Sequence, residues 1–295
     1  MNASGGTSAA ALVTAAARRF DAAGLHFGHG TDNAADEALF LVLHALGWSY
    51  DIAAEALEAP LDAAQRDAVE ALVRARIETR RPAAYLTGRM WFAGLEFAVD
   101  ERVLVPRSPL AELIAARFEP WRGARPVARL LDIGTGSGCI AIACAHFFPE
   151  ANVEASDISA DALAVAATNV ARHRMAGRVT LHEADLYPPA AAPYDIIVSN
   201  PPYVPRAVWR ALPPEYQAEP GLGLVAGDDG MSCLEGILAG APAALAPGGL
   251  LVVEVGEIWA EVAARYPQLP FTWLEFAHGG EGVFLLTRED LVAGV

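Results

Sequence analysis

The stretch from Leu130 to Ala145 constrains the fold of this chain most strongly. It begins with apolar residues, turns through three glycines at positions 134, 136 and 138, and continues with small apolar residues. An apolar run that ends in a glycine turn predicts a buried strand, and the small residues after it predict a helix packed close to that strand. A strand, a tight turn and a helix in this order are typical of a doubly wound α/β sheet, which binds ligands at the carboxyl ends of its strands.

The spacing of these glycines indicates the ligand. A dinucleotide-binding turn has the pattern G-x-G-x-x-G, whereas this chain has G-x-G-x-G with an aspartate two residues before the first glycine, as in S-adenosylmethionine sites. Two alternatives remain open: the turn binds a dinucleotide, or it only allows a helix and a strand to pack closely. We predict an S-adenosylmethionine site that includes Asp132, Gly134, Thr135, Gly136, Ser137 and Gly138.

Acidic residues follow the next two strands along the chain. A strand predicted over 152–156 ends at Asp157, whose carboxylate can accept hydrogen bonds from both ribose hydroxyls of a nucleoside. A third strand is predicted over 179–182, and Asp185 and Leu186 follow it, with Asp185 in reach of the adenine amino group. We predict these three residues as cofactor-binding. A helix cap at Asp157 and a turn at Asp185 are the structural alternatives.

The tetrad Asn200-Pro201-Pro202-Tyr203 follows a fourth apolar strand at 196–198, so it is expected at the same edge of the sheet. Proline lacks an N–H group and fixes φ, so the two prolines stiffen the loop and leave backbone carbonyls as acceptors. The Asn200 side-chain oxygen and the Pro201 carbonyl can then accept both N–H bonds of one planar NH2 group, on which Tyr203 can stack. An amide nitrogen held in this way has its lone pair drawn out of resonance for methylation. We predict the tetrad as catalytic, with Asn200 also beside the cofactor; a plain turn is the alternative.

Charge and composition limit the partners of the chain. The 295 residues include 21 basic and 36 acidic side chains, a net charge of 21 − 36 = −15, so the surface repels phosphate backbones and attracts basic proteins. Nucleic acid is therefore not expected as a direct substrate. The three cysteines (139, 144 and 233) lack the spacing of a metal site and suit a reducing cytoplasm. We expect neither a signal peptide nor a membrane span, because prolines and glycines interrupt the apolar run over 237–255.

Residues 1–84 predict a small helical domain. Apolar residues recur there at helical spacing, and Asp62 and Gln65 form a capping box at the start of the last helix. Gly47 is a helix stop signal. The helices are expected over 9–23, 33–46 and 62–79.

The rest of the chain predicts a hairpin and then a mixed sheet. Residues 85–107 are rich in aromatic and β-branched types around Gly94, which predicts a β-hairpin that joins two domains. Residues 108–295 predict a doubly wound, seven-stranded Rossmann-like sheet whose final two strands form an antiparallel hairpin. The late strands are expected over 249–255, 271–276 and 283–287.

Taken together, the helical domain, the hairpin, the glycine turn and the Asn-Pro-Pro-Tyr tetrad resemble the N(5)-glutamine protein methyltransferases over nearly the whole chain. The resemblance implies transfer of a methyl group from S-adenosylmethionine to a glutamine side chain of a translation protein. It also implies that the helical domain and the hairpin help to select that protein. We expect direct in-line transfer without a general base.

Two subgroups of this family differ in the segment before the catalytic domain. The subgroup that acts on peptide chain release factors typically has Pro-Arg-Pro-x-Thr-Glu there, whereas this chain reads Val-Pro-Arg-Ser-Pro-Leu-Ala-Glu over 105–112. This sequence is similar to the subgroup that acts on the third large-subunit ribosomal protein, as are 27–38, Glu219-Pro220 and 226–230. The implied partner is therefore a basic ribosomal protein, and the oligomeric state is not indicated. Gln217-Ala218 and Met231-Ser232-Cys233 depart from the subgroup pattern, at positions that concern target contacts rather than chemistry.

Three other functions stay open at this point. The release-factor subgroup is the nearest alternative. A DNA amino-group methyltransferase uses a similar tetrad, although the acidic charge argues against it. A ribosome-assembly factor without catalytic activity is the third. Two further residues have alternative interpretations: His29 is a turn residue or a target contact, and Arg107 is a surface cation or a residue that orders the cleft.

Overall fold

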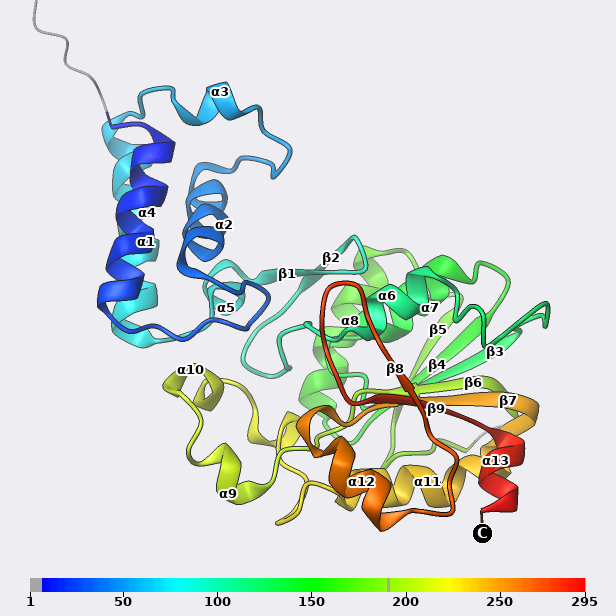
Figure 1. The fold of residues 1–295 in the computed structure, drawn as a ribbon. Helices are drawn as coiled ribbons and strands as arrows, with labels where there is room; N and C mark the ends of the chain where they lie inside the picture. The colour runs from blue at the N-terminus through cyan, green and yellow to red at the C-terminus, as the bar shows by residue number, and fades with distance from the viewer. Residues whose placement is uncertain (1–6, 190–191, 295) are drawn as a thin grey trace, which may run out of the picture. The chain divides into compact units, whose positions relative to one another are not determined.

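The structure is a computed structural model that describes residues 7–189 and 192–294, and the chain divides into two compact units (Figure 1). The helical unit contains the chain as far as Arg89 together with Leu212–Ala218. The second unit contains Met90–Ala211 and the chain from Glu219 onward. The chain therefore leaves the second unit after Ala211, contributes a short segment to the first and returns. In the described parts of the chain, no helix has the length and apolar character needed to cross a membrane.

Three long helices form the framework of the helical unit, as predicted. The side chain of Asn33 accepts the N–H of Asp36 at the start of α2, and Gly47, with φ of 66°, ends it. The capping box of Asp62 and Gln65 at the start of α4 is confirmed. α2 packs against both α1 and α4. The helices of this unit are α1 (Ala9–Ala22), α2 (Ala34–Leu46), α3 (Ala54–Leu57), α4 (Ala63–Thr79), α5 (Ala83–Thr87) and α10 (Pro214–Gln217).

A buried ion cluster holds α10 within this unit. Arg76 Nε donates to Glu37 Oε1 at 2.7 Å, and Arg76 Nη1 lies 3.4 Å from Glu215 Oε1. Arg80 Nε reaches the same Glu215 oxygen at 2.9 Å. Arg76, Glu37 and Glu215 are each at most 1% exposed, and the His26 N–H also donates to Glu215. Arg76, Glu37, Arg80 and Glu215 are here called the Arg76 cluster. Buried charges persist in a fold only when they are paired, so this cluster fixes the segment 212–218 to α4.

The hairpin segment is shorter than the sequence predicted. β1 (Arg89–Phe92) and β2 (Leu95–Ala98) form a two-stranded sheet around Ala93 and Gly94, which have φ of 49° and 78°. Positive φ at both central residues is the geometry of a tight hairpin turn. Residues 83–87, at the start of the predicted segment, form α5 because they pack against α2 and α4. Residues 104–107, at its end, have no regular secondary structure.

Seven strands form the sheet of the second unit, in the order β5-β4-β3-β6-β7-β9-β8. The first five of these run parallel, while β9 is antiparallel to both β7 and β8. This confirms the predicted doubly wound sheet and its antiparallel terminal pair, although β8 is shorter than expected. The strands are β3 (Arg129–Ile133), β4 (Asn152–Asp157), β5 (Val179–Glu183), β6 (Tyr194–Ser199), β7 (Leu245–Glu254), β8 (Thr272–Leu274) and β9 (Val283–Thr287).

Helices cover both faces of this sheet (Figure 1). On one face Leu131, Ile197 and Leu251 lie in register on β3, β6 and β7 and pack against Leu234 and Ile237 of α11. The register also brings the carboxyl ends of β3, β4 and β6 to one edge. The helices are α6 (Leu110–Ala115), α7 (Cys139–Phe147) and α8 (Ala160–Arg172) on one side, and α11 (Ser232–Ala244), α12 (Trp259–Arg265) and α13 (Arg288–Ala293) on the other, with α9 (Arg206–Trp209) and short 3₁₀ helices at Gly221–Gly223 and Gly256–Ile258 in connections.

Candidate active site

The glycine turn between β3 and α7 leaves open space in front of two of its glycines. Gly134 and Gly136 have φ of 72° and 54°, and a Cβ atom on either would meet no described atom within 4 Å. Gly138 is different, because a Cβ there would lie 3.3 Å from the Cβ of Ala166 on α8. The first two glycines therefore leave room for a ligand, and the third allows two helices to approach closely. The close packing that the sequence suggested is therefore present at Gly138, while binding of the methyl donor at Gly134 and Gly136 stays a prediction.

Asn169 on α8 holds the turn from behind and was not predicted. Its Nδ2 donates to the Ser137 and Ala98 carbonyls, at 2.9 Å each, and its Oδ1 accepts the Ala98 N–H at 2.7 Å. The side chain is fully buried. One amide therefore joins the second strand of the hairpin to the glycine turn. The available signal was a polar residue on the otherwise apolar face formed by Val165, Ala166 and Val170.

Asp132 lies behind the turn and is not among the described residues that line the cavity. It is fully buried, and its Oδ2 accepts hydrogen bonds from Thr135 Oγ1 at 2.6 Å and from the Ala141 N–H at 3.0 Å. Burial raises the pKa of Asp132 to about 7, against the effect of these two hydrogen bonds. The two hydrogen bonds hold the carboxyl group against the turn, and a direct contact of Asp132 with the cofactor stays a prediction.

Asp157 lies at the end of β4 and lines the cavity, as its place in the sequence suggested. Its Oδ2 accepts the Gly136 N–H and its Oδ1 accepts the Ser159 N–H, each at 2.9 Å. The N-cap of α8 is Ser159, whose side chain accepts the Ala162 N–H. Asp157 thus braces the glycine turn instead of capping the helix. A carboxylate has about four lone-pair sites, so two hydrogen bonds leave capacity for hydroxyl groups of a ligand.

Asp185 and Leu186 line the cavity beyond β5. Asp185 is exposed, and Leu186 has a φ of 66°, in the left-handed region. The Leu186 carbonyl accepts Ser156 Oγ at 2.5 Å, and a Cβ on Gly236 of α11 would lie 2.4 Å from Leu186 Cδ1. The bend after β5 is therefore held by β4 and by close packing on α11.

The tetrad begins where β6 ends. Asn200, Pro201 and Pro202 line the same cavity as the glycine turn. Just before them, Ser199 Oγ donates to the Ile133 carbonyl at 2.7 Å, which joins the ends of β6 and β3. The structure therefore brings the predicted amide acceptors and the predicted cofactor turn to one cavity.

Tyr203 lies beside this cavity and is absent from its lining in the described parts of the chain. Its hydroxyl donates to Glu254 Oε1 at 3.1 Å, and its ring lies against Gly256, where a Cβ would be 2.6 Å from Tyr203 Cε2. Burial, and then the charge of Glu254, raise the pKa of Tyr203 and keep the hydroxyl protonated. Stacking of this ring on an amide plane has no counterpart in these contacts and stays a prediction.

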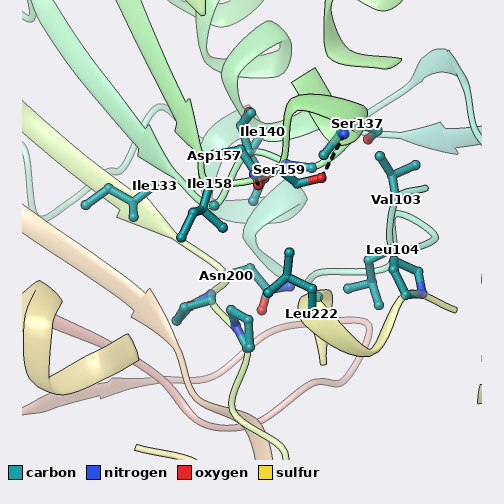
Figure 2. A pocket seen from close by; sticks show the side chains of 18 of the residues that line it. Val103, Leu104, Ile133, Ser137, Ile140, Asp157, Ile158, Ser159, Asn200 and Leu222 are labelled. Atoms are coloured by element: carbon teal, nitrogen blue, oxygen red, sulfur yellow. Dashed lines mark hydrogen bonds between the residues drawn. The ribbon is translucent and has the colours of Figure 1, made fainter. Parts of the chain in front are cut away.

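The cavity has a volume of about 240 Å³ and lies at the edge where β3, β4 and β6 end (Figure 2). Asp157 and Asn200 approach it from different strand ends, and Leu104 and Leu222 stand across from the sheet. Most of this second wall was not predicted. It comes from two segments distant in the sequence, residues 102–106 and the 3₁₀ helix at Gly221–Gly223, and apart from Arg102 these residues are apolar.

Glu219 joins the two segments of this apolar wall. Its carboxylate accepts both Arg107 Nη1 at 2.6 Å and Arg107 Nη2 at 2.8 Å, and also the Val105 N–H at 3.0 Å. Glu219 is 3% exposed, so the forked ion pair is largely shielded from water. Of the two interpretations of Arg107, this geometry supports the one in which the residue orders the cleft.

Comparison with known proteins agrees with this geometry. The model of the methyltransferase small domain matches residues 115–210, and that of the PrmC N-terminal domain matches residues 11–88. A ribosomal protein uL3 glutamine methyltransferase of Xanthomonas campestris pv. campestris is 50% identical, over 96% of this chain and 92% of its own length. A protein of the same name from Bordetella pertussis is 47% identical over 95% of each chain.

The chain belongs to the ribosomal protein uL3 glutamine methyltransferases. It is an S-adenosylmethionine-dependent methyltransferase, which confirms the predicted family, enzyme class and methyl donor. Among solved structures, the hMettl16 catalytic domain in complex with the MAT2A 3'UTR hairpin 6 has a TM-score of 0.50 at 16% identity, over 74% of this chain and 79% of that chain. At that identity the similarity concerns the methyltransferase fold alone.

Proposed function

We propose that this protein methylates the side-chain amide nitrogen of a glutamine in ribosomal protein uL3, the third protein of the large subunit. Its membership of the uL3 glutamine methyltransferases supports this reaction. For the residues that carry it out, the decisive observation is that Asn200 and Pro201 line the same cavity as Gly134, Gly136 and Asp157. A single cavity that joins a methyl-donor site to a pair of amide acceptors suits a direct transfer between two bound molecules.

The glycine turn and the two acids beyond β4 and β5 would hold S-adenosylmethionine, which supplies a methyl group activated by its sulfonium. Gly134 and Gly136 leave the space that a side chain would fill. Asp157 would offer its remaining acceptor sites to the ribose hydroxyls, and Asp185 and Leu186 would contact the adenine at the bend after β5. Asp132, Thr135, Ser137 and Gly138 act by fixing the turn: Thr135 by its hydrogen bond to Asp132, and Ser137 by its bond to Asn169.

Asn200 and Pro201 prepare the glutamine for attack. The Asn200 side-chain oxygen and the Pro201 carbonyl accept the two N–H bonds of the amide, and Pro202 keeps the loop stiff. Such hydrogen bonds are worth about 4–6 kcal/mol in an apolar medium but only about 0.5–1.5 kcal/mol net in water, so the apolar wall that excludes water strengthens them. The methylated nitrogen then releases one proton, to solvent or to the Asn200 side chain.

The acidic surface suits a basic target protein. With a net charge of −15 the chain attracts basic ribosomal proteins and repels nucleic acid. We propose that it takes its target directly as protein, in the cytoplasm, and that the helical unit and the hairpin help to choose it.

Variants at Asn200 test this assignment. Asn200→Ala removes one amide acceptor without touching the glycine turn, so turnover on uL3 should fall by about a hundredfold or more while S-adenosylmethionine affinity stays within a few-fold. Single-turnover reactions, read by mass spectrometry of uL3, measure this effect. Asn152→Ala, at the exposed beginning of β4, is the control and should keep the wild-type rate.

The same assay distinguishes the nearest alternative substrate. A peptide chain release factor is offered in parallel with uL3, and the proposal expects methylation of uL3 only. If Asn200→Ala methylates uL3 at the wild-type rate, the tetrad is only a turn. If the enzyme prefers the release factor, that protein is the target instead of uL3.

A further inference from the structure

Glu254 is a buried acid at the carboxyl end of β7, in a strand whose neighbouring residues are apolar. It is 6% exposed, and each of its oxygens accepts one hydroxyl group. Oε2 accepts Ser108 Oγ at 2.5 Å, and Oε1 accepts Tyr203 Oη at 3.1 Å. Burying a carboxyl group costs free energy unless its oxygens accept hydrogen bonds, as both oxygens of Glu254 do. One of the two donors is Tyr203, the last residue of the tetrad, so Glu254 is connected directly to the predicted catalytic loop.

Tyr203 is closely packed against its neighbours on several sides. The hydroxyl is held by Glu254, and the ring lies on the backbone of Gly256, which has a φ of 51°. On the other side, a Cβ on Gly230 would lie only 2.3 Å from the Tyr203 carbonyl oxygen. Ring, hydroxyl and backbone of Tyr203 are therefore all in contact with fixed neighbours.

A fixed Tyr203 also fixes the amide acceptors. Only Pro201 and Pro202 separate it from Asn200, and the proline rings restrict φ of both residues while also restricting the residue before each of them. Three successive residues with little torsional freedom transmit the orientation of Tyr203 to the Pro201 carbonyl and the Asn200 side chain.

Ser108 extends the same anchor to the opposite wall. Its hydroxyl donates to Glu254 and accepts the Leu110 N–H at 3.2 Å at the start of α6. Ser108 and Arg107 both line the cavity, next to the mainly apolar segment at 102–106. Glu254 therefore joins the tetrad loop to the segment that faces it.

We propose that Glu254 is a positioning residue for methyl transfer: its carboxylate holds the Tyr203 hydroxyl, and the anchored tyrosine keeps Asn200 and the Pro201 carbonyl aligned on the glutamine amide. This inference rests on the proposed function of the tetrad. It assigns Tyr203 a role through its hydroxyl in addition to any contact of its ring with substrate.

A double-mutant cycle tests the proposal on the full-length protein. Tyr203→Phe deletes the hydroxyl alone, and Glu254→Leu removes its acceptor; each should lower kcat on uL3 by about tenfold, as expected for loss of alignment. The double variant should also lie about tenfold below wild type rather than a hundredfold, because the two changes remove the same hydrogen bond. Glu254→Gln keeps an acceptor oxygen and should recover most of the rate.

The other readouts separate positioning from a general structural loss. S-adenosylmethionine affinity, from calorimetric titration, should stay within about twofold of wild type in each variant, so that kcat falls while cofactor binding does not. Glu257→Gln, at an exposed acid three residues along the chain, should behave as wild type. Multiplying losses in the double variant, or an unchanged kcat in Tyr203→Phe, overturns the positioning role. Wild-type protein that fails to methylate uL3 overturns the proposed function instead.

Discussion

The helical unit buries its acids against opposite charges, whereas the methyltransferase unit also buries acids against neutral donors. In the helical unit, Glu37 and Glu215 meet guanidinium groups of the Arg76 cluster. In the methyltransferase unit, Glu219 is paired with the guanidinium of Arg107. In the same unit, however, Asp132 accepts hydrogen bonds from a threonine hydroxyl and a backbone N–H, and Glu254 accepts two hydroxyl groups. Acids buried against opposite charges join chain segments in both units, while the acids buried against neutral donors lie at strand ends beside the cavity.

The pKa values of these buried acids reflect the difference between charged and neutral partners only in part. Burial raises the pKa of Glu37, with the charge of Arg76 acting against it. Burial likewise raises the pKa of Glu254, and that of Asp132 to about 7, where hydrogen bonds are the main opposing influence. Burial thus raises the pKa in both units, and what differs is the opposing influence: the charge of Arg76 comes first at Glu37, whereas hydrogen bonds from neutral groups come first at Asp132 and Glu254.

The largest expected effect concerns that joint. Glu215→Ala leaves Arg76 buried without one of its carboxylates, so the free energy of unfolding should fall by about 3–5 kcal/mol in urea titrations of the full chain. The control is Glu70→Ala, which breaks the exposed pair with Arg19 and should cost at most about 1 kcal/mol. Equal losses in the two variants would remove the distinction between buried and exposed pairs.

The second effect concerns the dependence of stability on pH. The folded-state pKa of Asp132 is raised, so the folded protein holds a proton that the unfolded chain releases between about pH 4 and pH 7, and stability falls as pH rises through that window. Asp132→Asn cannot ionise and should become more stable relative to wild type across the window, by up to about 4 kcal/mol above pH 7. Urea titrations at several pH values measure the difference.

A control keeps this pH test specific. Asp161→Asn changes an exposed acid on α8 of the same unit and should leave the pH dependence of stability as in wild type. A constant offset between Asp132→Asn and wild type at every pH would show that Asp132 is ionised throughout the window.

The third effect concerns the cofactor end of the cavity. Asp157→Ala removes the acceptor of ribose hydroxyls, and Gly136→Val fills the open space while straining a residue with positive φ, so each should weaken S-adenosylmethionine binding by about tenfold or more, or about 1.4 kcal/mol. Calorimetric titration measures the affinities, with Asp161→Ala as the control. Wild-type affinity in both cavity variants would leave the glycine turn without a ligand.

The smallest effect concerns capture of the target. Attraction between the acidic chain and basic uL3 is screened by salt, so KM for uL3 should rise by about threefold as ionic strength increases from about 0.05 to about 0.3 M, while KM for S-adenosylmethionine changes little. Initial rates at several salt concentrations measure both constants. A salt-independent KM for uL3 would place recognition on uncharged contacts.

Tests of target choice need the intact chain. A fragment that begins near residue 108 would retain Glu215 but lose Arg76 and Arg80, because the segment at 212–218 belongs to the helical unit. Loss of activity in such a fragment would therefore have two possible causes: the broken ion pairs of Glu215 or the missing recognition surface.

Local patterns sufficed for much of the fold and the site. The caps of α2 and α4, the order of the strands and the glycine turn depend on neighbouring residues and on backbone geometry, which a sequence displays directly. Asp157, Asp185 and Asn200 were predicted to lie together and the structure places them in one cavity, because parallel strands bring their carboxyl ends to one edge of the sheet. The predicted hairpin was too long. Residues 83–87 form a helix because they pack against α2 and α4, although aromatic and β-branched residues follow them in the sequence.

Only the tertiary structure decided which groups hold the site in place. Ser108 and Glu254 are 146 positions apart, and Arg76 and Glu215 are 139 apart. A hydrogen bond between residues so far apart produces no periodic pattern in the sequence, because it depends on how whole helices and strands pack and not on neighbouring residues. The sequence by itself determined the family and the methyl donor of this protein, and it predicted the strand ends at which the site residues lie. The packing of distant segments determined that Asp132 supports the turn from behind, that Tyr203 is anchored by Glu254, and that α10 belongs to the helical unit.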